Sequence, residues 1–134
     1  MARRPQRSRG PRSPRPTGVE SPAAYRKLVL ESPVPVLVDV HADWCAPCRA
    51  LAPRLSRLLK ELDGRARIVQ LDAEQRRTRS VVERLRVSSL PTWVLFDGGR
   101  EVLRSDGPRR LDRVETRLRQ LAGTSGKGRG RQVD

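Results

Sequence analysis

Two cysteines, Cys45 and Cys48, stand two residues apart and are the only cysteines in the 134-residue chain. At this spacing the thiols can close a disulfide with each other, and one can attack a foreign disulfide while the other resolves the mixed disulfide. An apolar run precedes the pair and an amphipathic run follows it, which predicts a strand over residues 36–41 and a helix that begins near Cys48. A helix start stabilises a thiolate because it carries unpaired N–H groups and partial positive charge. The pattern predicts thiol–disulfide exchange, with Cys45 as nucleophile and the more buried Cys48 as resolving thiol.

A cysteine pair can also form a structural disulfide or part of a metal site. The two cysteines and the single histidine, His41, supply three ligands, whereas structural zinc takes four. Cluster assembly between two subunits through such a pair is rare. We therefore favour redox use and expect no metal and no bound cofactor besides the redox-active disulfide.

The residues around the pair resemble a known family. Residues 36–49 read VLVDVHADWCAPCR, with Asp39 six residues before Cys45. This segment looks like the strand and active-site turn of the thioredoxin family. Pro53 stands five residues after Cys48, where the family kinks its second helix.

The resemblance continues downstream. Residues 90–92 (LPT) resemble the family's cis-proline loop, and residues 97–107 resemble its terminal hairpin and the glycine after it. The resemblance covers about residues 20–121. It implies an α/β thioredoxin fold, with a central mixed β-sheet flanked by helices on both faces, and a protein-disulfide reductase activity.

Asp39 lies in an otherwise apolar strand that leads to the active-site turn. A buried carboxylate without a cationic partner has a raised pKa, which suits it to accept a proton from the second thiol. The resemblance gives Asp39 this role of proton acceptor and donor; the alternative is a strand-end aspartate bonded to backbone or water. Ile68 stands where the family often has a lysine near this aspartate, so we expect the pKa of Asp39 to be higher still.

Ala46 and Pro47 separate the cysteines, where the family most often has Gly-Pro. Pro47 has no N–H to bond a thiolate, so the reduced form is stabilised less, which favours a reductant over an oxidant. A thiol oxidase or isomerase of an oxidising compartment is also disfavoured because no secretory h-region is visible.

The resemblance assigns substrate binding to Leu90, Pro91 and Thr92. The Leu90–Pro91 bond is expected to be cis, the backbone before Pro91 to pair with the extended chain of the substrate, and Pro91 to keep competing groups off the thiols. We expect Trp44 to cover the site and to form an apolar patch with Ala46, Pro47 and Leu90. Trp93 is interpreted as a core residue instead.

His41 replaces the tryptophan that the family usually has at this position, and strand alternation places it on the same face as Asp39. One hypothesis is that an imidazole near the dithiol makes its reactivity depend on pH between about 5 and 8. We favour the alternative, a histidine hydrogen-bonded to a neighbour such as Asp72 that fills most of the lost indole volume.

Periodicity and turn residues predict the elements that must position this site. Ser21-Pro22 begins a helix whose apolar side uses Ala24 and Leu28, with Tyr25 as a further candidate. Helices are predicted to about residue 31, over 48–62 and 74–86 and from Pro108, and strands over 36–41, 66–71, 92–96 and 101–104. This order predicts an α/β sandwich with a mixed sheet.

The formal net charge is +14. Residues 1–19 hold six arginines and no acid, and we expect a disordered Arg/Pro-rich tail there, a thioredoxin-like domain over 20–121 and a flexible Gly/basic tail over 122–134. A solvated tail is favoured over an electrostatic arm, and prolines argue against an amphipathic transit peptide. An alternative function is a redox-sensitive module whose basic tails bind nucleic acid or acidic partners. Aromatic residues are only 3%, and no recognition motif is visible.

The sequence thus predicts a disulfide reductase that acts on disulfide-containing proteins. Its electrons are expected from an NADPH-dependent, thioredoxin-reductase-like flavoprotein. We expect a monomer in the bacterial cytoplasm that takes part in electron transport and redox homeostasis, with no membrane attachment, because no apolar run is long enough to span a bilayer.

Overall fold

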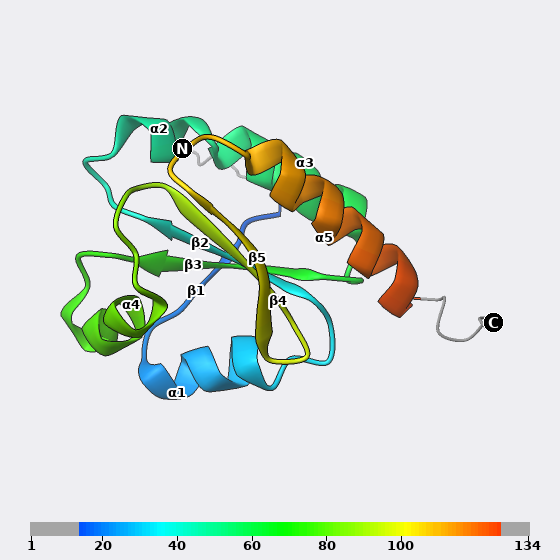
Figure 1. Cartoon of the computed structure of the whole chain (residues 1–134), viewed down its shortest axis with the longest axis horizontal. Coiled ribbons are helices and arrows are strands. Elements are labelled where there is room, and N and C mark those ends of the chain that lie inside the picture. The colour runs from blue at the N-terminus through cyan, green and yellow to red at the C-terminus, as the bar shows by residue number, and fades with distance from the viewer. Residues whose placement is uncertain (1–13, 127–134) are drawn as a thin grey trace, which may run out of the picture.

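Strand β2 (Val36–His41) lies at the centre of a five-stranded sheet because its side chains, Asp39 and His41 excepted, are apolar on both faces. The computed structural model describes residues 14–126, with the strand order β1-β3-β2-β4-β5 (Figure 1). β1 (Thr17–Gly18) and β3 (Arg67–Asp72) run parallel to β2. β4 (Thr92–Asp97) is antiparallel to β2, and β5 (Arg100–Asp106) is antiparallel to β4. The predicted mixed sheet is confirmed.

Helices cover both faces of the sheet (Figure 1). One face packs against α1 (Pro22–Tyr25), the π-helical η1 (Arg26–Leu30) and α4 (Arg79–Leu85), and the other against α3 (Ala52–Leu62) and α5 (Leu111–Gly126). The short α2 (Ala46–Ala50) begins just beyond the carboxyl end of β2. The cysteine pair therefore sits at the end of the central strand, where a helix starts.

The predicted helix over residues 48–62 is two helices in the structure. The last turn of α2 tightens at Leu51, whose N–H donates to the Cys48 carbonyl three residues back. Pro53, in the first turn of α3, has no N–H to continue the α2 hydrogen-bond ladder. The break expected near Pro53 is thus confirmed, and it separates the cysteine-bearing turn from the long helix.

Other boundaries differ from the prediction. The helix predicted over 74–86 opens as the 3₁₀ turn η2 (Arg76–Thr78), and α5 begins at Leu111 because Arg110 has a φ of 59°. In α1 and η1 the buried residues are Tyr25, one of the predicted residues, and Val29, which was not predicted. The predicted Ala24 and Leu28 are half-buried, and Leu28 packs against the core.

Regular structure extends past both limits of the domain predicted over residues 20–121. β1 is the two-residue strand Thr17–Gly18, and α5 ends at Gly126. Residues 1–13 and 127–134 of the predicted tails lie outside the described residues. Among residues 14–126, no helix has the length and apolar character needed to cross a membrane.

Two apolar clusters make the core, one on each face of the sheet. The face of α3 and α5 buries Leu37 and Ile68, and the face of η1 and α4 buries Val38 and Val69. Alternate residues of each strand thus face opposite clusters. Asp39 falls on the α3 and α5 face, two residues after Leu37.

Gly98 and Gly99 form the two-residue turn between β4 and β5, with φ angles of 64° and 82°. A Cβ on Gly99 would lie 2.7 Å from the Leu30 carbonyl oxygen, whereas a Cβ on Gly98 would meet nothing within 4 Å. The tip of the hairpin is therefore held against the end of η1.

Replacing these glycines by alanine separates the cost of positive φ from the cost of the close approach. Gly98→Ala is expected to lower the free energy of unfolding by about 1–2 kcal/mol, the cost of left-handed backbone for a residue with a Cβ. Gly99→Ala should lose a further ~1–3 kcal/mol because its Cβ collides with backbone. Urea unfolding of both variants measures the difference; equal losses would contradict the packing of the hairpin tip on η1.

Candidate functional site: the cysteine pair and the buried aspartate

Cys45 is the N-cap residue of α2, and the Cys48 N–H donates to its Sγ at 3.2 Å. The helix begins at Ala46, two residues earlier than predicted, so Cys45 caps the helix from just outside its first turn. The Cα atoms of Cys45 and Cys48 are 5.3 Å apart, and the two residues form a disulfide. One sulfur thus accepts a helix N–H, in the place where negative charge is stabilised.

The burial of the two cysteines differs from the prediction. Cys45 is 4% exposed and Cys48 is 7% exposed, so Cys48 is not the more buried of the pair. Both pack in a small apolar cluster with Ala42, and Leu90 contacts this cluster. Burial in the disulfide form therefore does not show which cysteine is the nucleophile and which is the resolving thiol.

The surface beside the cysteines is apolar and exposed. Trp44 is 67% exposed, and Ala46 and Pro47 are also exposed. The Trp44 Nε1–H donates to Glu74 Oε2 at 3.2 Å, which ties the indole to the loop after β3. Glu74 was not predicted at the site, because only the fold brings together residues 30 positions apart.

The Leu90–Pro91 peptide is cis, as predicted. Thr92 is buried, and its Oγ1–H donates to the Ser89 carbonyl at 2.6 Å. A Cβ on Gly107 would lie 3.6 Å from Ser89 Oγ, so the end of β5 adjoins this loop. The structure brings the predicted residues of the turn at Cys45 and the loop at Pro91 together.

Asp39 is 1% exposed, and both of its carboxylate oxygens accept hydrogen bonds from side chains. Gln70 Nε2 donates to Oδ2 at 2.8 Å, and Trp93 Nε1 donates to Oδ1 at 3.0 Å. Burial raises the pKa of Asp39, and the Gln70 bond, the charge of His41 and the Trp93 bond oppose that rise. A carboxyl group in these surroundings can hold or release a proton near the cysteines.

Gln70, not Ile68, is the residue beside Asp39. In the parallel pairing of β2 and β3, Asp39 lies opposite Gln70, while Ile68 lies opposite Leu37 and is buried in the core. Gln70 was not predicted as this neighbour, because strand register could not be read from the sequence. The signal that could have found Gln70 is its polar type in the middle of an apolar strand.

Trp93 is a core residue, as predicted, and is 0% exposed. Its hydrogen bond to Asp39 was missed. A buried indole N–H needs an acceptor, and Asp39 lies directly opposite Trp93 in the antiparallel pairing of β2 and β4.

His41 is half-buried at the end of β2 and pairs in register with Asp72. Within residues 14–126, its imidazole forms no hydrogen bond, so the expected bond to Asp72 is not made. Asp72 Oδ1 instead accepts the Glu74 N–H at 2.8 Å. The imidazole faces a cavity and acts on Asp39 through its charge.

A cavity of about 380 Å³ lies between the cysteine turn and the ends of β2 and β3. Its lining includes Cys48, His41 and Gln70, together with Asp43 and Arg49. Cys48 and the amide that binds Asp39 thus open onto the same space, which is large enough for water.

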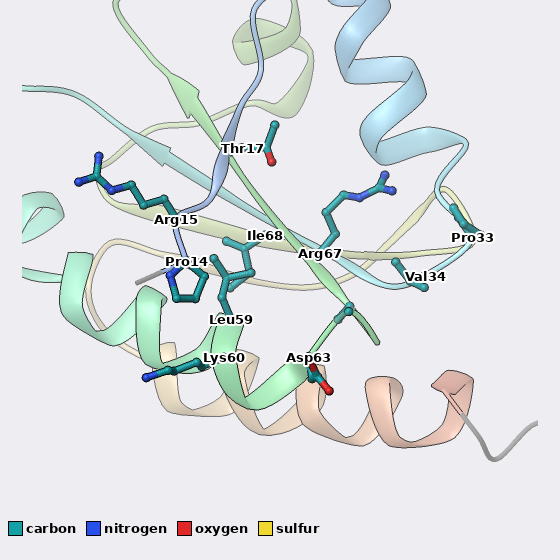
Figure 2. Close-up of a pocket in the computed structure, with 12 residues that line it drawn as sticks. Pro14, Arg15, Thr17, Pro33, Val34, Leu59, Lys60, Asp63, Arg67 and Ile68 are labelled. Carbon is teal, nitrogen blue, oxygen red and sulfur yellow. The ribbon is translucent and has the colours of Figure 1, made fainter. Parts of the chain in front are cut away.

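A larger cavity of about 660 Å³ lies between β3, α3 and the segment before β1 (Figure 2). Pro14, Leu59 and Ile68 converge there, while the charged ends of Arg15 and Lys60 point away (Figure 2). Neither cysteine lines it, so it is not the site of the chemistry. Across the described part of the chain, no three His, Cys, Asp or Glu side chains are grouped to hold a metal ion.

Comparison with known proteins agrees with this geometry. The sequence model of the thioredoxin family matches residues 17–120. A thioredoxin of Synechocystis sp. is 34% identical over 82 residues, which cover 61% of this chain and 75% of that protein. A thioredoxin of Rickettsia felis is 34% identical over 79 residues, covering 59% and 73%.

The chain belongs to the thioredoxin family. A mutant thioredoxin from Halobacterium salinarum superposes with a TM-score of 0.69 and 26% identity, covering 84% of this chain and 96% of that chain. Thioredoxin O1 from Arabidopsis thaliana has the same fold, with a TM-score of 0.70, 20% identity and coverage of 81% and 99%. Family membership and a cysteine pair that closes a disulfide make this thioredoxin-family protein a thiol–disulfide oxidoreductase.

Asp39→Asn tests whether burying the ionised carboxyl group lowers the free energy of unfolding. Because burial raises its pKa in the folded state, Asp39 favours folding below the unfolded value of 3.8, and this contribution is lost as the pH rises through the folded pKa. At pH 8 the variant is expected to be more stable by about 1–3 kcal/mol, since the Gln70 amide can rotate to accept from the new amide. The gain should vanish below about pH 4.

Urea unfolding across this pH range measures the gain. Asp43→Asn is the matched control, since Asp43 is exposed two residues beyond the strand and should show no such pH-dependent gain. A variant at Asp39 that is less stable than the native protein at pH 8 would contradict the raised pKa.

Proposed function

We propose that this protein reduces disulfides in other proteins, with Cys45 as nucleophile and Cys48 as resolving thiol. The observation that carries the proposal is the hydrogen bond from the Cys48 N–H to Cys45 Sγ at the start of α2. In the reduced protein the same N–H and the helix dipole stabilise a Cys45 thiolate, which is the attacking species.

The reaction takes two exchange steps. The Cys45 thiolate attacks one sulfur of the substrate disulfide, forms a mixed disulfide and releases the other substrate sulfur as a thiolate. Cys48, once deprotonated, attacks Cys45 Sγ, closes the Cys45–Cys48 disulfide and releases the second substrate thiolate. Two electrons thus pass from the protein dithiol to the substrate.

Asp39 is proposed as the acceptor of the Cys48 proton and as its donor in the reverse step. The support is its raised pKa and its place behind Gln70, which lines the same cavity as Cys48. General-base transfer can run through one water, and the cavity has room for it. His41, on the same cavity, is proposed only as part of the electrostatic surroundings.

Substrate binding is proposed at the exposed rim around the disulfide. Trp44, Ala46 and Pro47 offer an apolar surface, and Leu90 packs against the cysteines. The backbone before the cis-Pro91, in the loop that ends at Thr92, would pair with an extended substrate segment. Such backbone pairing would accept many sequences.

The partners and location are proposed from the family. Electrons would come from an NADPH-dependent flavoprotein of the thioredoxin-reductase kind, in a bacterial cytoplasm, as part of cellular electron transport and redox homeostasis. The protein would act as a monomer. The similarity to thioredoxins of Synechocystis sp. and Rickettsia felis supports this setting. No observation on residues 14–126 favours the alternative of a nucleic-acid-binding module, and we do not propose it.

Serine variants of the two cysteines separate their roles. Cys45→Ser should lose insulin reduction under dithiothreitol entirely, because no thiolate attacks the substrate. Cys48→Ser should react once and remain joined to the substrate, because the mixed disulfide has no resolving thiol. Mass spectrometry of the trapped complex checks this assignment, and a complex trapped instead by Cys45→Ser would reverse it.

Pro47→Ala tests the reductant direction. An N-cap side chain can accept from the residue two or three positions on, and here these are Pro47, which has no N–H, and Cys48. Alanine adds a second donor, so the pKa of Cys45 should fall and the reduction potential should rise by up to about 30 mV, the equivalent of one charge-assisted hydrogen bond.

Glutathione equilibration measures that potential. Ala46→Gly is the control, since it loosens the same turn without adding a donor. An unchanged potential in Pro47→Ala would show that the missing N–H does not set the direction.

A further inference from the structure

Arg54 of α3 is held at a fixed position by two carboxylates of α5. Its Nε and Nη2 donate to Glu115 Oε1 at 2.8 and 2.5 Å, and Nη2 donates to Asp112 Oδ1 at 2.6 Å. The Arg54 side chain is 28% exposed and that of Glu115 is 12% exposed. This partly buried guanidinium cannot swing freely into solvent.

The guanidinium lies over the ring of Trp93, with its Cζ 5.6 Å from the ring centroid. The same indole donates its Nε1–H to Asp39 Oδ1 at 3.0 Å. Trp93 is 0% exposed. One buried side chain therefore carries a cation on its ring and a carboxyl group on its N–H.

These two contacts reinforce each other. A cation over an aromatic ring draws π-electron density toward itself and leaves the ring edge more positive. The N–H on that edge becomes a stronger donor, and a hydrogen bond to a carboxylate in a low-dielectric interior gains most from this polarisation. A stronger donor favours the ionised form of the acceptor.

We propose that Arg54 is a positioning residue for the proton-transfer step: through the indole of Trp93 it lowers the proton affinity of Asp39. The route is the chain of contacts from Glu115 and Asp112 to Arg54, to Trp93 and to Asp39. This inference rests on the proposed role of Asp39 in the reaction. It adds a group from α3, the helix that follows the cysteine turn.

Other charged or titratable groups also act on Asp39 from the elements around it. From β2, the charge of His41 opposes protonation of Asp39. From α2, Cys48 lines the cavity that His41 and Gln70 also line. β3 contributes the neutral amide of Gln70. The acids of α5 bind Arg54 and offset part of its charge. The indole of Trp93 contacts both Arg54 and Asp39, which makes it the path of the proposed effect.

The test compares Arg54→Met with Arg119→Met. Arg119 also joins α3 to α5, through Glu61 and Glu115, so its loss removes a comparable ion-pair bridge. Within residues 14–126, no ring contact of Arg119 with Trp93 is found. A purely structural role predicts the same behaviour from both variants.

The readout is the titration midpoint of the Asp39 carboxyl carbon, followed by nuclear magnetic resonance in the reduced and oxidised proteins. Arg54→Met should raise the midpoint by about half a pH unit or more, the equivalent of one cation–π contact, and Arg119→Met should leave it unchanged. Arg54→Lys, which keeps the charge but not the planar stack, should fall between. Equal midpoints in Arg54→Met and the native protein would overturn the inference.

Trp93→Phe keeps the ring and removes the donor, and it completes a double-mutant cycle. In that background Arg54→Met should produce no further shift. A full further shift would overturn the indole route. If Trp93→Phe does not fold, the test is the Asp39 midpoint with different residues at position 54. The inference requires the midpoint to be highest with methionine, lower with lysine and lowest with arginine, and any other order would overturn it.

The pH profile of disulfide reduction separates this inference from the proposed function. If Asp39 moves protons in the reaction, the profile of Arg54→Met shifts to higher pH with the Asp39 midpoint. A profile that is also unchanged in Asp39→Asn would remove Asp39 from the mechanism. The titration midpoints would then still confirm or overturn the effect of Arg54.

Discussion

A carboxyl group buried in the central strand of the sheet must find hydrogen-bond donors, and this requirement organises the interior around Asp39. Its two oxygens take one donor from each neighbouring strand, Gln70 of β3 and Trp93 of β4. The register of three strands is thereby tied to a single side chain. Arg54 packs on the indole from α3, so the helix layer is coupled to the same carboxyl group.

The position of the cysteine pair is set by the residue at which β2 ends. The strand ends at His41, the turn closes with the Cys45 N–H donating to the Ala42 carbonyl, and α2 begins directly after Cys45. A sulfur at this point receives a helix N–H and the positive end of the helix dipole. Pro47 withholds the next N–H, so the turn supplies a limited amount of stabilisation to a thiolate.

Long-range ion pairs give this small domain a second means of fixing the site. Arg54 and Arg119 join α3 to α5 through Glu61, Asp112 and Glu115. Networks of this kind fix the relative position of two helices better than isolated surface pairs, because each partner limits the rotamers of the next. The helix that follows the cysteine turn is thus held over the sheet at the level of Trp93.

The sequence by itself determined the chemistry and the order of the elements. Cys45 and Cys48, the apolar run before them and the proline at position 91 are local signals, and each depends on residues within a few positions along the chain. The strand Val36–His41 and the cis peptide before Pro91 were therefore predicted correctly. Boundaries that depend on one backbone angle, such as the start of α5 after Arg110, were not.

Only the tertiary structure decided which side chains meet. Strand register selected Gln70 rather than Ile68 as the neighbour of Asp39, since a strand pattern fixes which face a residue occupies and not what lies opposite. The tertiary structure also showed that the core residue Trp93 donates a hydrogen bond to Asp39 and that Arg54 lies over its ring. These contacts join residues 31 to 54 positions apart, and the free energy that selects them comes from packing and from satisfying buried polar groups, which no local pattern encodes.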